Sequence, residues 1–121
     1  MGLILVDTNI VIYAIKGLKQ VEPYLEEYDF SISEITIIEL LGVKEIDDFT
    51  LSIRKRFVNS CSIFPFNSII RENVIRLKQQ YALKIPDAII AASALHYDIP
   101  FLTADKEFKK IKELESIILE L

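Results

Sequence analysis

Short apolar runs alternate with helix-like segments along the whole chain, and this alternation constrains the fold more than any other feature. Five runs are expected to be strands: 3–6, 30–33, 62–66, 101–103 and 117–119. Runs so short and so apolar are typical of strands that are covered on both faces. The sequence therefore predicts an α/β domain of three layers, α/β/α, with a mainly parallel central sheet of four to five strands.

The segments between these runs carry helical patterns. We expect helices over 10–15, 21–28, 33–42, 49–59, 69–81 and 88–96, and a short helix from Asp105. The segment 88–96 is small or apolar at nearly every position, which is typical of a helix buried on all sides. No long linker, repeat or low-complexity tract divides the chain, so residues 1–121 are expected to form a single domain.

The chain carries more apolar material than a domain of this size can easily hide. Hydrophobic residues make up 51% of its 121 residues. A domain this small buries only about two thirds of the surface that its unfolded chain exposes. We therefore expect a homodimer or a bound partner chain to cover the surplus.

Cysteine content and the apolar start bear on the compartment. Cys61 is the single cysteine and cannot form an intramolecular disulfide, which, with no secretory leader in view, favours the reducing cytoplasm. The apolar run 3–6 is interrupted by Asp7 long before it reaches the length of a membrane span. No association with a membrane is expected.

The charge balance points to one acidic site. A net charge of −4, from 18 acids and 14 bases, argues against a protein that coats nucleic acid duplexes. Four acids are expected where an apolar run gives way to a helix: Asp7, Glu39, Asp87 and Asp105. Without them the chain holds 14 acids and 14 bases. The carboxyl ends of parallel strands meet at one sheet edge, so these acids are expected to converge there.

Helix capping is the simpler explanation for three of these acids. Asp7, Asp87 and Asp105 each stand at or near the start of an expected helix. An Asp side chain in that position accepts a hydrogen bond from a backbone N–H, and its charge complements the helix dipole. For each of these residues taken alone, capping and metal binding remain open.

Glu39 fits capping less well. It is the only ionisable side chain between Glu34 and Lys44, and no basic residue lies within helical reach. A carboxylate in such apolar surroundings is costly unless it is paired or binds a cation. A capping box from Thr36 to Glu39 is the alternative, but it leaves Ser33, the better capping residue, without a helix to cap. We therefore interpret Glu39 as a metal ligand.

The residue types also select the metal. Four carboxylates packed together repel one another, and some take up protons unless a divalent ion compensates. Oxygen ligands favour Mg²⁺ or Mn²⁺. One His and one Cys in the chain are too few for a structural zinc site.

The ordered set of these short motifs resembles the PIN-domain ribonucleases and, among them, the VapC-type toxins of toxin–antitoxin pairs. The resemblance spans nearly the whole chain and is weakest over 47–60. The matching pieces are Asp7-Thr8-Asn9, Ser33 before Glu39, Pro86-Asp87-Ala88 with Ala91-Ala92, and Thr103-Ala104-Asp105 with Phe108.

The resemblance implies a metal-dependent endoribonuclease that hydrolyses RNA phosphodiester bonds, with a small antitoxin as partner. Asp7, Glu39, Asp87 and Asp105 would be the acidic quartet, and one or two Mg²⁺ or Mn²⁺ ions would polarise the phosphate and activate water. In our hypothesis Asp7 and Asp87 are the central ligands, while Glu39 and Asp105 bind a second ion or hold water.

Further residues are implied as supports. Thr8, Asn9 and Thr103 would orient the carboxylates through their hydroxyl or amide groups. Lys84 and Lys106, each next to a motif, are candidates to contact the RNA backbone, and an ordinary solvated lysine is the alternative for both.

Three other functions are alternatives to this one. A PIN-fold nuclease that processes RNA without an antitoxin has the same site, and so does a catalytically silent module that only holds metal. A receiver-like signalling domain needs an acidic pair after the first strand, a phosphoacceptor Asp after a central strand and a lysine after the last. Here Asp7 is followed by Thr8 and the run 62–66 by Asn67, which argues against a receiver.

Overall fold

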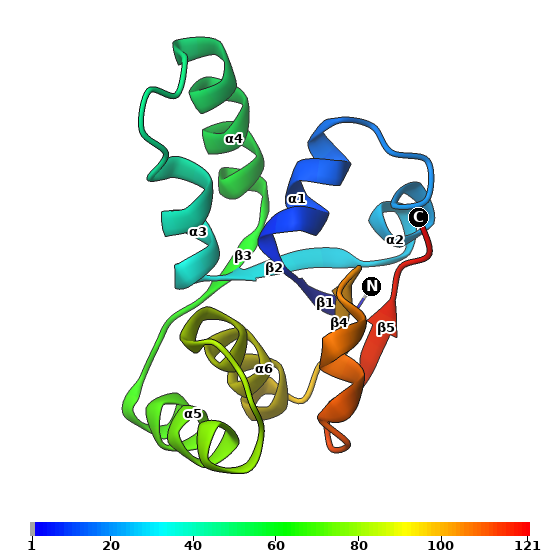
Figure 1. The fold of residues 1–121 in the computed structure, drawn as a ribbon. Coiled ribbons are helices and arrows are strands. Elements are labelled where there is room, and N and C mark those ends of the chain that lie inside the picture. The colour runs from blue at the N-terminus through cyan, green and yellow to red at the C-terminus, as the bar shows by residue number, and fades with distance from the viewer. Residues whose placement is uncertain (1) are drawn as a thin grey trace.

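A five-stranded parallel sheet forms the centre of the molecule (Figure 1). The computed structural model describes residues 2–121, and Met1 lies outside the described residues. The strands are β1 Leu3–Val6, β2 Asp29–Ser33, β3 Ser62–Phe64, β4 Phe101–Thr103 and β5 Ser116–Ile118. Their order is β3-β2-β1-β4-β5, and each neighbouring pair is parallel. The predicted α/β fold with a mainly parallel sheet is confirmed.

Six α-helices and one short 3₁₀ helix join the strands within residues 2–121. They are α1 Thr8–Ile15, α2 Glu22–Glu27, α3 Glu34–Leu41, α4 Asp48–Ser60, α5 Ser68–Gln80, α6 Ile85–Tyr97 and the 3₁₀ helix η1 Lys106–Lys110. The predicted bounds lie within a few residues of the observed ones, but the predicted strand 62–66 is too long at its end. β3 stops at Phe64 because Pro65 has no N–H to donate to a neighbouring strand. α6 begins at Ile85, since a proline is tolerated in the first helical turn.

The sheet separates two apolar cores. In β1, Ile4 and Val6 point into one core with residues of α1, α3 and α4, while Leu5 points into the other with α5 and α6. All three side chains are fully buried. A strand covered on both faces is what the unbroken apolar run predicts, and Figure 1 shows helices on the two sides of the sheet.

Helix α6 is buried along most of its length, as its small residues predict. Ala88, Ala91, Ala92 and Ala94 are at most 1% exposed. Small side chains let α6 lie close to the sheet on one side and to α5 on the other. Only its ends are open, with Ile85 at 58% exposure.

The strand directions gather the candidate residues. α1 follows β1, α3 follows β2 and η1 follows β4, so three of the connections leave the sheet at its carboxyl edge.

None of the helices within residues 2–121 combines the length and apolar character needed to cross a membrane.

We predict that Ala91→Leu lowers the free energy of unfolding by about 1–3 kcal/mol, because the larger side chain overpacks a filled core. Urea denaturation of the purified protein measures this. Ala82→Leu is the matched control at an exposed alanine and should change stability by less than about 0.5 kcal/mol. Equal effects of the two substitutions would contradict the packing described for α6.

Candidate functional site

All four acids line one cavity at the carboxyl edge of the sheet. The cavity has a volume of about 200 Å³ and is bounded by residues of α1, α3, α6 and η1 and the turns before them. Its lining residues are Asp7, Thr8, Asn9, Glu39, Asp87, Ile90, Asp105 and Phe108. The structure thus brings the four acids together with two of the expected supporting residues. Ile90 was missed as a wall residue, because nothing in its sequence context separates a cavity wall from the core.

Asp7 is held by bonds to both of its carboxylate oxygens. It caps α1, with Oδ1 accepting a hydrogen bond from the Ile10 N–H at 3.1 Å, and Oδ2 accepts one from the Thr103 hydroxyl at 2.5 Å. Burial raises the pKa of Asp7, these two hydrogen bonds oppose the rise, and the charges of Asp105 and Asp87 add to it. Capping and membership of the cavity are therefore compatible for this residue.

Thr103 links the first acid to the last. Its fully buried hydroxyl donates to Asp7 and accepts a hydrogen bond from the Asp105 N–H at 3.1 Å. Asp105 in turn caps η1, because its Oδ1 accepts the Glu107 N–H at 2.9 Å. Thr103 lies beneath the cavity, outside the residues that line it.

Glu39 reaches the cavity in a way that the sequence did not predict. It lies in the second half of α3, as the predicted helix 33–42 places it, but it is exposed, so its expected apolar surroundings are wrong. Helix α3 turns Thr36 and Leu40 inward, which leaves Glu39 on the open side. Its Oε1 accepts a hydrogen bond from the Thr8 hydroxyl at 2.6 Å.

The alternative capping box at Glu39 is also wrong. Ser33 caps α3, and its hydroxyl accepts the Ile35 N–H at 3.2 Å. Thr36 lies inside the helix, and its buried hydroxyl has no hydrogen-bond partner among the described residues.

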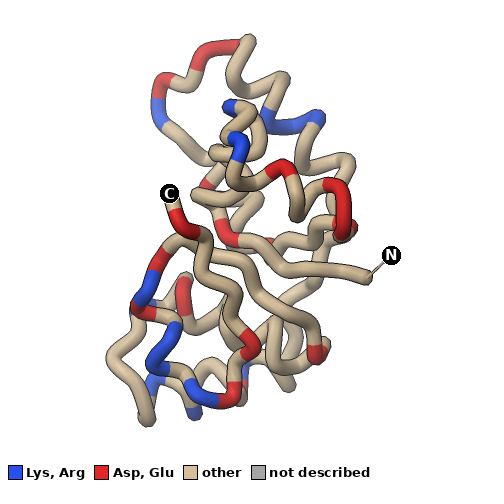
Figure 2. Tube along the Cα trace, turned by 90° about the vertical axis from the view of Figure 1, so that its right-hand side faces the viewer, with Lys and Arg blue, Asp and Glu red and all other residues tan. Residues whose placement is uncertain are grey.

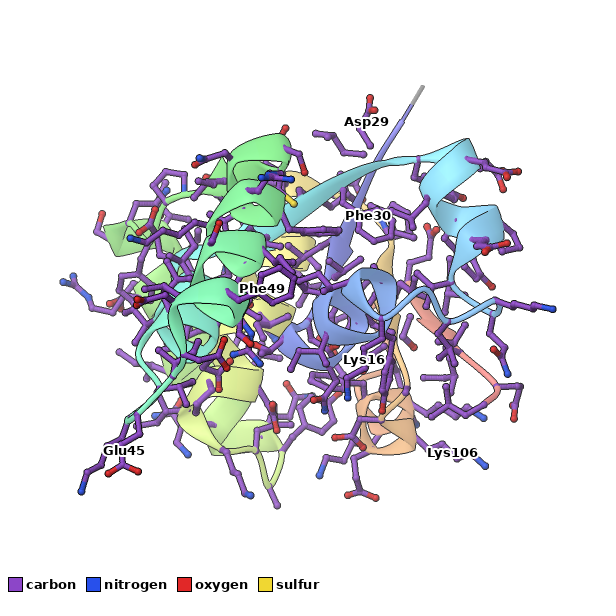
Figure 3. The ribbon with its side chains drawn as sticks, turned by 90° about the horizontal axis from the view of Figure 1, so that it is seen from above. Lys16, Asp29, Phe30, Glu45, Phe49 and Lys106 are labelled. Carbon is purple, nitrogen blue, oxygen red and sulfur yellow. The ribbon has the colours of Figure 1, made fainter. Side chains whose placement is uncertain are left out.

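Asp87 lies in the first turn of α6 but does not cap it. Burial raises the pKa of Asp87, as does the nearby charge of Asp105, while Lys84 opposes the rise; Glu39 raises the pKa further and Lys110 lowers it. The expected phosphate contacts, Lys84 and Lys106, are both exposed and lie outside the cavity lining. Figure 3 shows Lys106 at the outer edge of η1.

The donor set suits a hard divalent cation. The four acids supply only carboxylate oxygens, and none of them takes part in an ion pair found within residues 2–121. As the described side chains stand, no three His, Cys, Asp or Glu residues are close enough to hold a metal ion together. Binding therefore requires side-chain rotation, and the exposed Glu39 and Asp105 have room for it.

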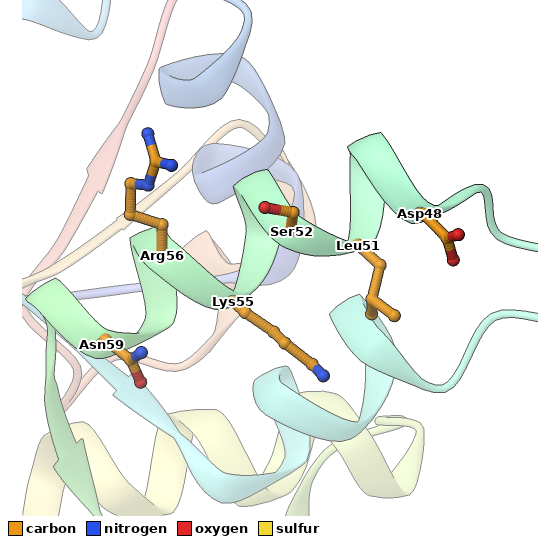
Figure 4. A pocket seen from close by; sticks show the side chains of 6 residues that line it. All are labelled: Asp48, Leu51, Ser52, Lys55, Arg56 and Asn59. Carbon is orange, nitrogen blue, oxygen red and sulfur yellow. The ribbon is translucent and has the colours of Figure 1, made fainter.

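A larger depression lies on the outer face of α4 (Figure 4). It has a volume of about 430 Å³ and is lined by Asp48, Leu51, Ser52, Lys55, Arg56 and Asn59. All of these residues come from one helix, and a single acid is among them. Because no groups converge there from separate elements, the smaller acidic cavity is the stronger candidate for chemistry.

We predict that Thr103→Val lowers the free energy of unfolding by about 1–3 kcal/mol, because it leaves a charged acceptor and a backbone donor without partners. Chemical denaturation at neutral pH measures the loss, and Thr103→Ser should recover most of it. Thr36→Val is the matched control, since its buried hydroxyl makes no bond and its removal should be neutral or stabilising. Equal costs for the two valine substitutions would contradict the link described for Thr103.

Comparisons with known proteins agree with this architecture. The chain is 29% identical to "Ribonuclease VapC" of Rickettsia bellii (strain RML369-C), covering 100% of this chain and 98% of that protein. It resembles a solved "Toxin-antitoxin complex from Klebsiella pneumoniae" with a TM-score of 0.78 and 31% identity over 91% of this chain and 93% of that one. VapBC2 from Rickettsia felis, solved bound to a DNA fragment from its promoter, has the same fold, with a TM-score of 0.86, 24% identity, and 98% and 99% coverage.

The family model for the PIN domain matches residues 4–114, which include β2, β3, β4, all of β1 but Leu3, and all four acids. The chain therefore belongs to the PIN domain family.

Proposed function

We propose that this protein is a metal-dependent endoribonuclease and the toxin of a toxin–antitoxin pair. The observation that carries the proposal is the convergence of four carboxylates from separate elements on one cavity. The similarity to a ribonuclease VapC along the whole chain supports the choice of RNA as substrate. A receiver-like function is set aside, because the chain belongs to another family.

In this proposal Asp7 and Asp87 are the central ligands of a Mg²⁺ or Mn²⁺ ion, and Glu39 and Asp105 complete the set. The ion, when bound, supplies Lewis acidity and lowers the pKa of the attacking water. The chain's own contribution is to hold the carboxylates in place. Thr103 restrains Asp7, and the Thr8 hydroxyl does the same for Glu39.

The remaining predicted residues have supporting roles in the proposal. Asn9 lines the cavity beside Thr8 and offers an amide to the ligand set or the substrate. Lys84 is exposed, yet its charge is close enough to affect Asp87, so it can contact an RNA phosphate at the cavity rim. Lys106 follows Asp105 directly and is exposed, which suits the same role.

The antitoxin partner is supported by an apolar groove between α1 and α4. The groove has a volume of about 190 Å³ and is lined by Ile12, Ile15, Lys16, Thr50, Ile53 and Arg54. Phe49, 76% exposed, projects from α4 near α1 (Figure 3). An amphipathic helix laid into this groove would cover these side chains. A PIN nuclease without an antitoxin is the alternative, and co-purification with the product of a neighbouring small gene decides between them.

A homodimer is supported by a second apolar surface, formed by α3, α6 and the turn after β3. Its cavity, also about 190 Å³, is lined by Ser33, Glu34, Ile35, Ile38, Phe66 and Ile89. Ile38 and Phe66 are 64% and 47% exposed. In a two-fold dimer, the same apolar surface of a second copy would lie against Ile38 and Phe66 and cover both side chains.

The single cysteine, Cys61, is a free thiol, which supports a location of this protein in the reducing cytoplasm.

We predict that Asp7→Asn and Glu39→Gln each reduce the rate of cleavage of a structured RNA in Mn²⁺ by more than about a hundredfold. Loss of a residue that only supports the metal ligands typically costs about ten- to a hundredfold in activity, so a larger loss indicates a ligand. Gel analysis of the cleaved RNA measures the rate. Asp29→Asn is the matched control, because Asp29 starts β2 at the opposite, amino edge of the sheet (Figure 3). RNA cleavage that survives in Asp7→Asn would overturn the proposed function.

We predict that Ile38→Asp converts the dimer to a monomer in size-exclusion chromatography with light scattering, because a buried unpaired charge is costly. Ile53→Asp, on the other apolar groove, should leave the dimer intact and weaken antitoxin binding. A dimer that persists in Ile38→Asp places the interface elsewhere.

A further inference from the structure

The helix that carries Asp87 begins without a cap of its own. The other cavity-lining helices, α1, α3 and η1, are capped by Asp7, Ser33 and Asp105, whose side chains each accept a hydrogen bond from a backbone N–H. Helix α6 begins after Lys84, whose side chain makes no capping bond. A lysine cannot cap in this way because it has no acceptor. Core packing holds the body of α6, but its first turn, which carries Asp87, has no side-chain cap, so the bonds of the loop 81–84 add to its local restraint.

Two lysines hold this loop by its carbonyl groups. The Lys78 ammonium, from α5, donates to the Leu83 carbonyl at 2.7 Å. The Lys110 ammonium, from η1, donates to the Ala82 carbonyl at 2.7 Å. Both carbonyls lie just before α6, so both bonds restrain the approach of the chain to Asp87.

The segment 105–115 makes a second contact with the same loop. The Tyr81 hydroxyl donates to the Glu113 Oε1 at 3.0 Å, and Arg76 of α5 donates to the other oxygen of Glu113 at 3.3 Å. The segment is densely charged, with four basic and four acidic residues among its eleven (Figure 2). The loop before α6 is thus fastened to the segment that also carries Asp105.

Lys110 differs from Lys78 in what it connects. Lys110 is the last residue of η1, and Asp105 caps the start of the same short helix. The bond from Lys110 to Ala82 therefore joins the element that carries Asp105 to the loop that leads to Asp87. Lys78 joins that loop only to α5, which carries none of the four acids.

We propose that Lys110 is a positioning residue that fixes the spacing between Asp87 and Asp105 and thereby the affinity of the cavity for a divalent cation. This inference rests on the proposed function, because it assigns Asp87 and Asp105 to one metal site. Lys110 touches neither metal nor RNA in this role. It acts through its hydrogen bond to the Ala82 carbonyl. The positive charge of Lys110 near Asp87 by itself disfavours a bound cation, so a loss of Mn²⁺ affinity on its removal reports the lost hydrogen bond and not the lost charge.

The test is titration of the purified protein with Mn²⁺ by isothermal calorimetry. Lys110→Met keeps the length of the side chain and removes its donor, and it should weaken Mn²⁺ binding about tenfold, the scale on which groups outside the ligand set act. Lys110→Arg keeps a donor and should restore most of the affinity. RNA cleavage by Lys110→Met should return to the wild-type rate at saturating Mn²⁺, because only the metal requirement is raised.

Lys78→Met is the matched control. It removes a bond of the same length to the neighbouring carbonyl, so its thermal stability should fall as much as that of Lys110→Met while its Mn²⁺ affinity stays unchanged. If Lys110→Met binds Mn²⁺ as tightly as wild type, or if both variants lose affinity equally, the positioning role is overturned and the proposed function stands. If wild type itself binds no Mn²⁺, the proposed metal site fails and the inference fails with it.

Discussion

The candidate site depends on the parallel pairing of β1 with β4. The pairing aligns Leu5 with Phe101 and Val6 with Leu102, so the next residues, Asp7 and Thr103, leave the sheet side by side. The hydrogen bond between them follows from that register, and Asp105 is then held by the same threonine hydroxyl. An antiparallel β4 would carry Asp105 to the opposite edge of the sheet and leave the cavity without one of its four acids.

Capping and chemistry share residues at this edge. Asp7 and Asp105 each satisfy a backbone N–H with one oxygen. Asp7 has its second oxygen on Thr103, and Glu39 is restrained by Thr8. Burial first, and the neighbouring carboxylates after it, raise the pKa values of Asp7 and Asp87, so keeping these groups charged at this edge is costly. A bound divalent cation offsets that cost, which is the physical reason to expect one here.

The sequence predicts most of the fold, because apolar runs and capping residues are local signals. Every strand and helix appears near its expected position, although β3 ends early at Pro65. Prediction failed where the answer depends on distant packing. The exposure of Glu39 follows from which side of α3 meets the core, and the role of Lys110 follows from a backbone carbonyl 28 residues away. Neither feature leaves a mark in local composition, whereas the convergence of Asp7, Asp87 and Asp105 at one sheet edge follows from topology.

The most direct test of one shared metal site is a crystal structure of the protein soaked in Mn²⁺, with the ion located by its anomalous scattering. The account predicts a strong peak inside the cavity, within bonding distance of Asp7 and Asp87 and with Glu39 or Asp105 turned toward it. A peak outside this cavity would contradict it. So would a cavity that holds no ion, with the four carboxylates still bonded to their present partners.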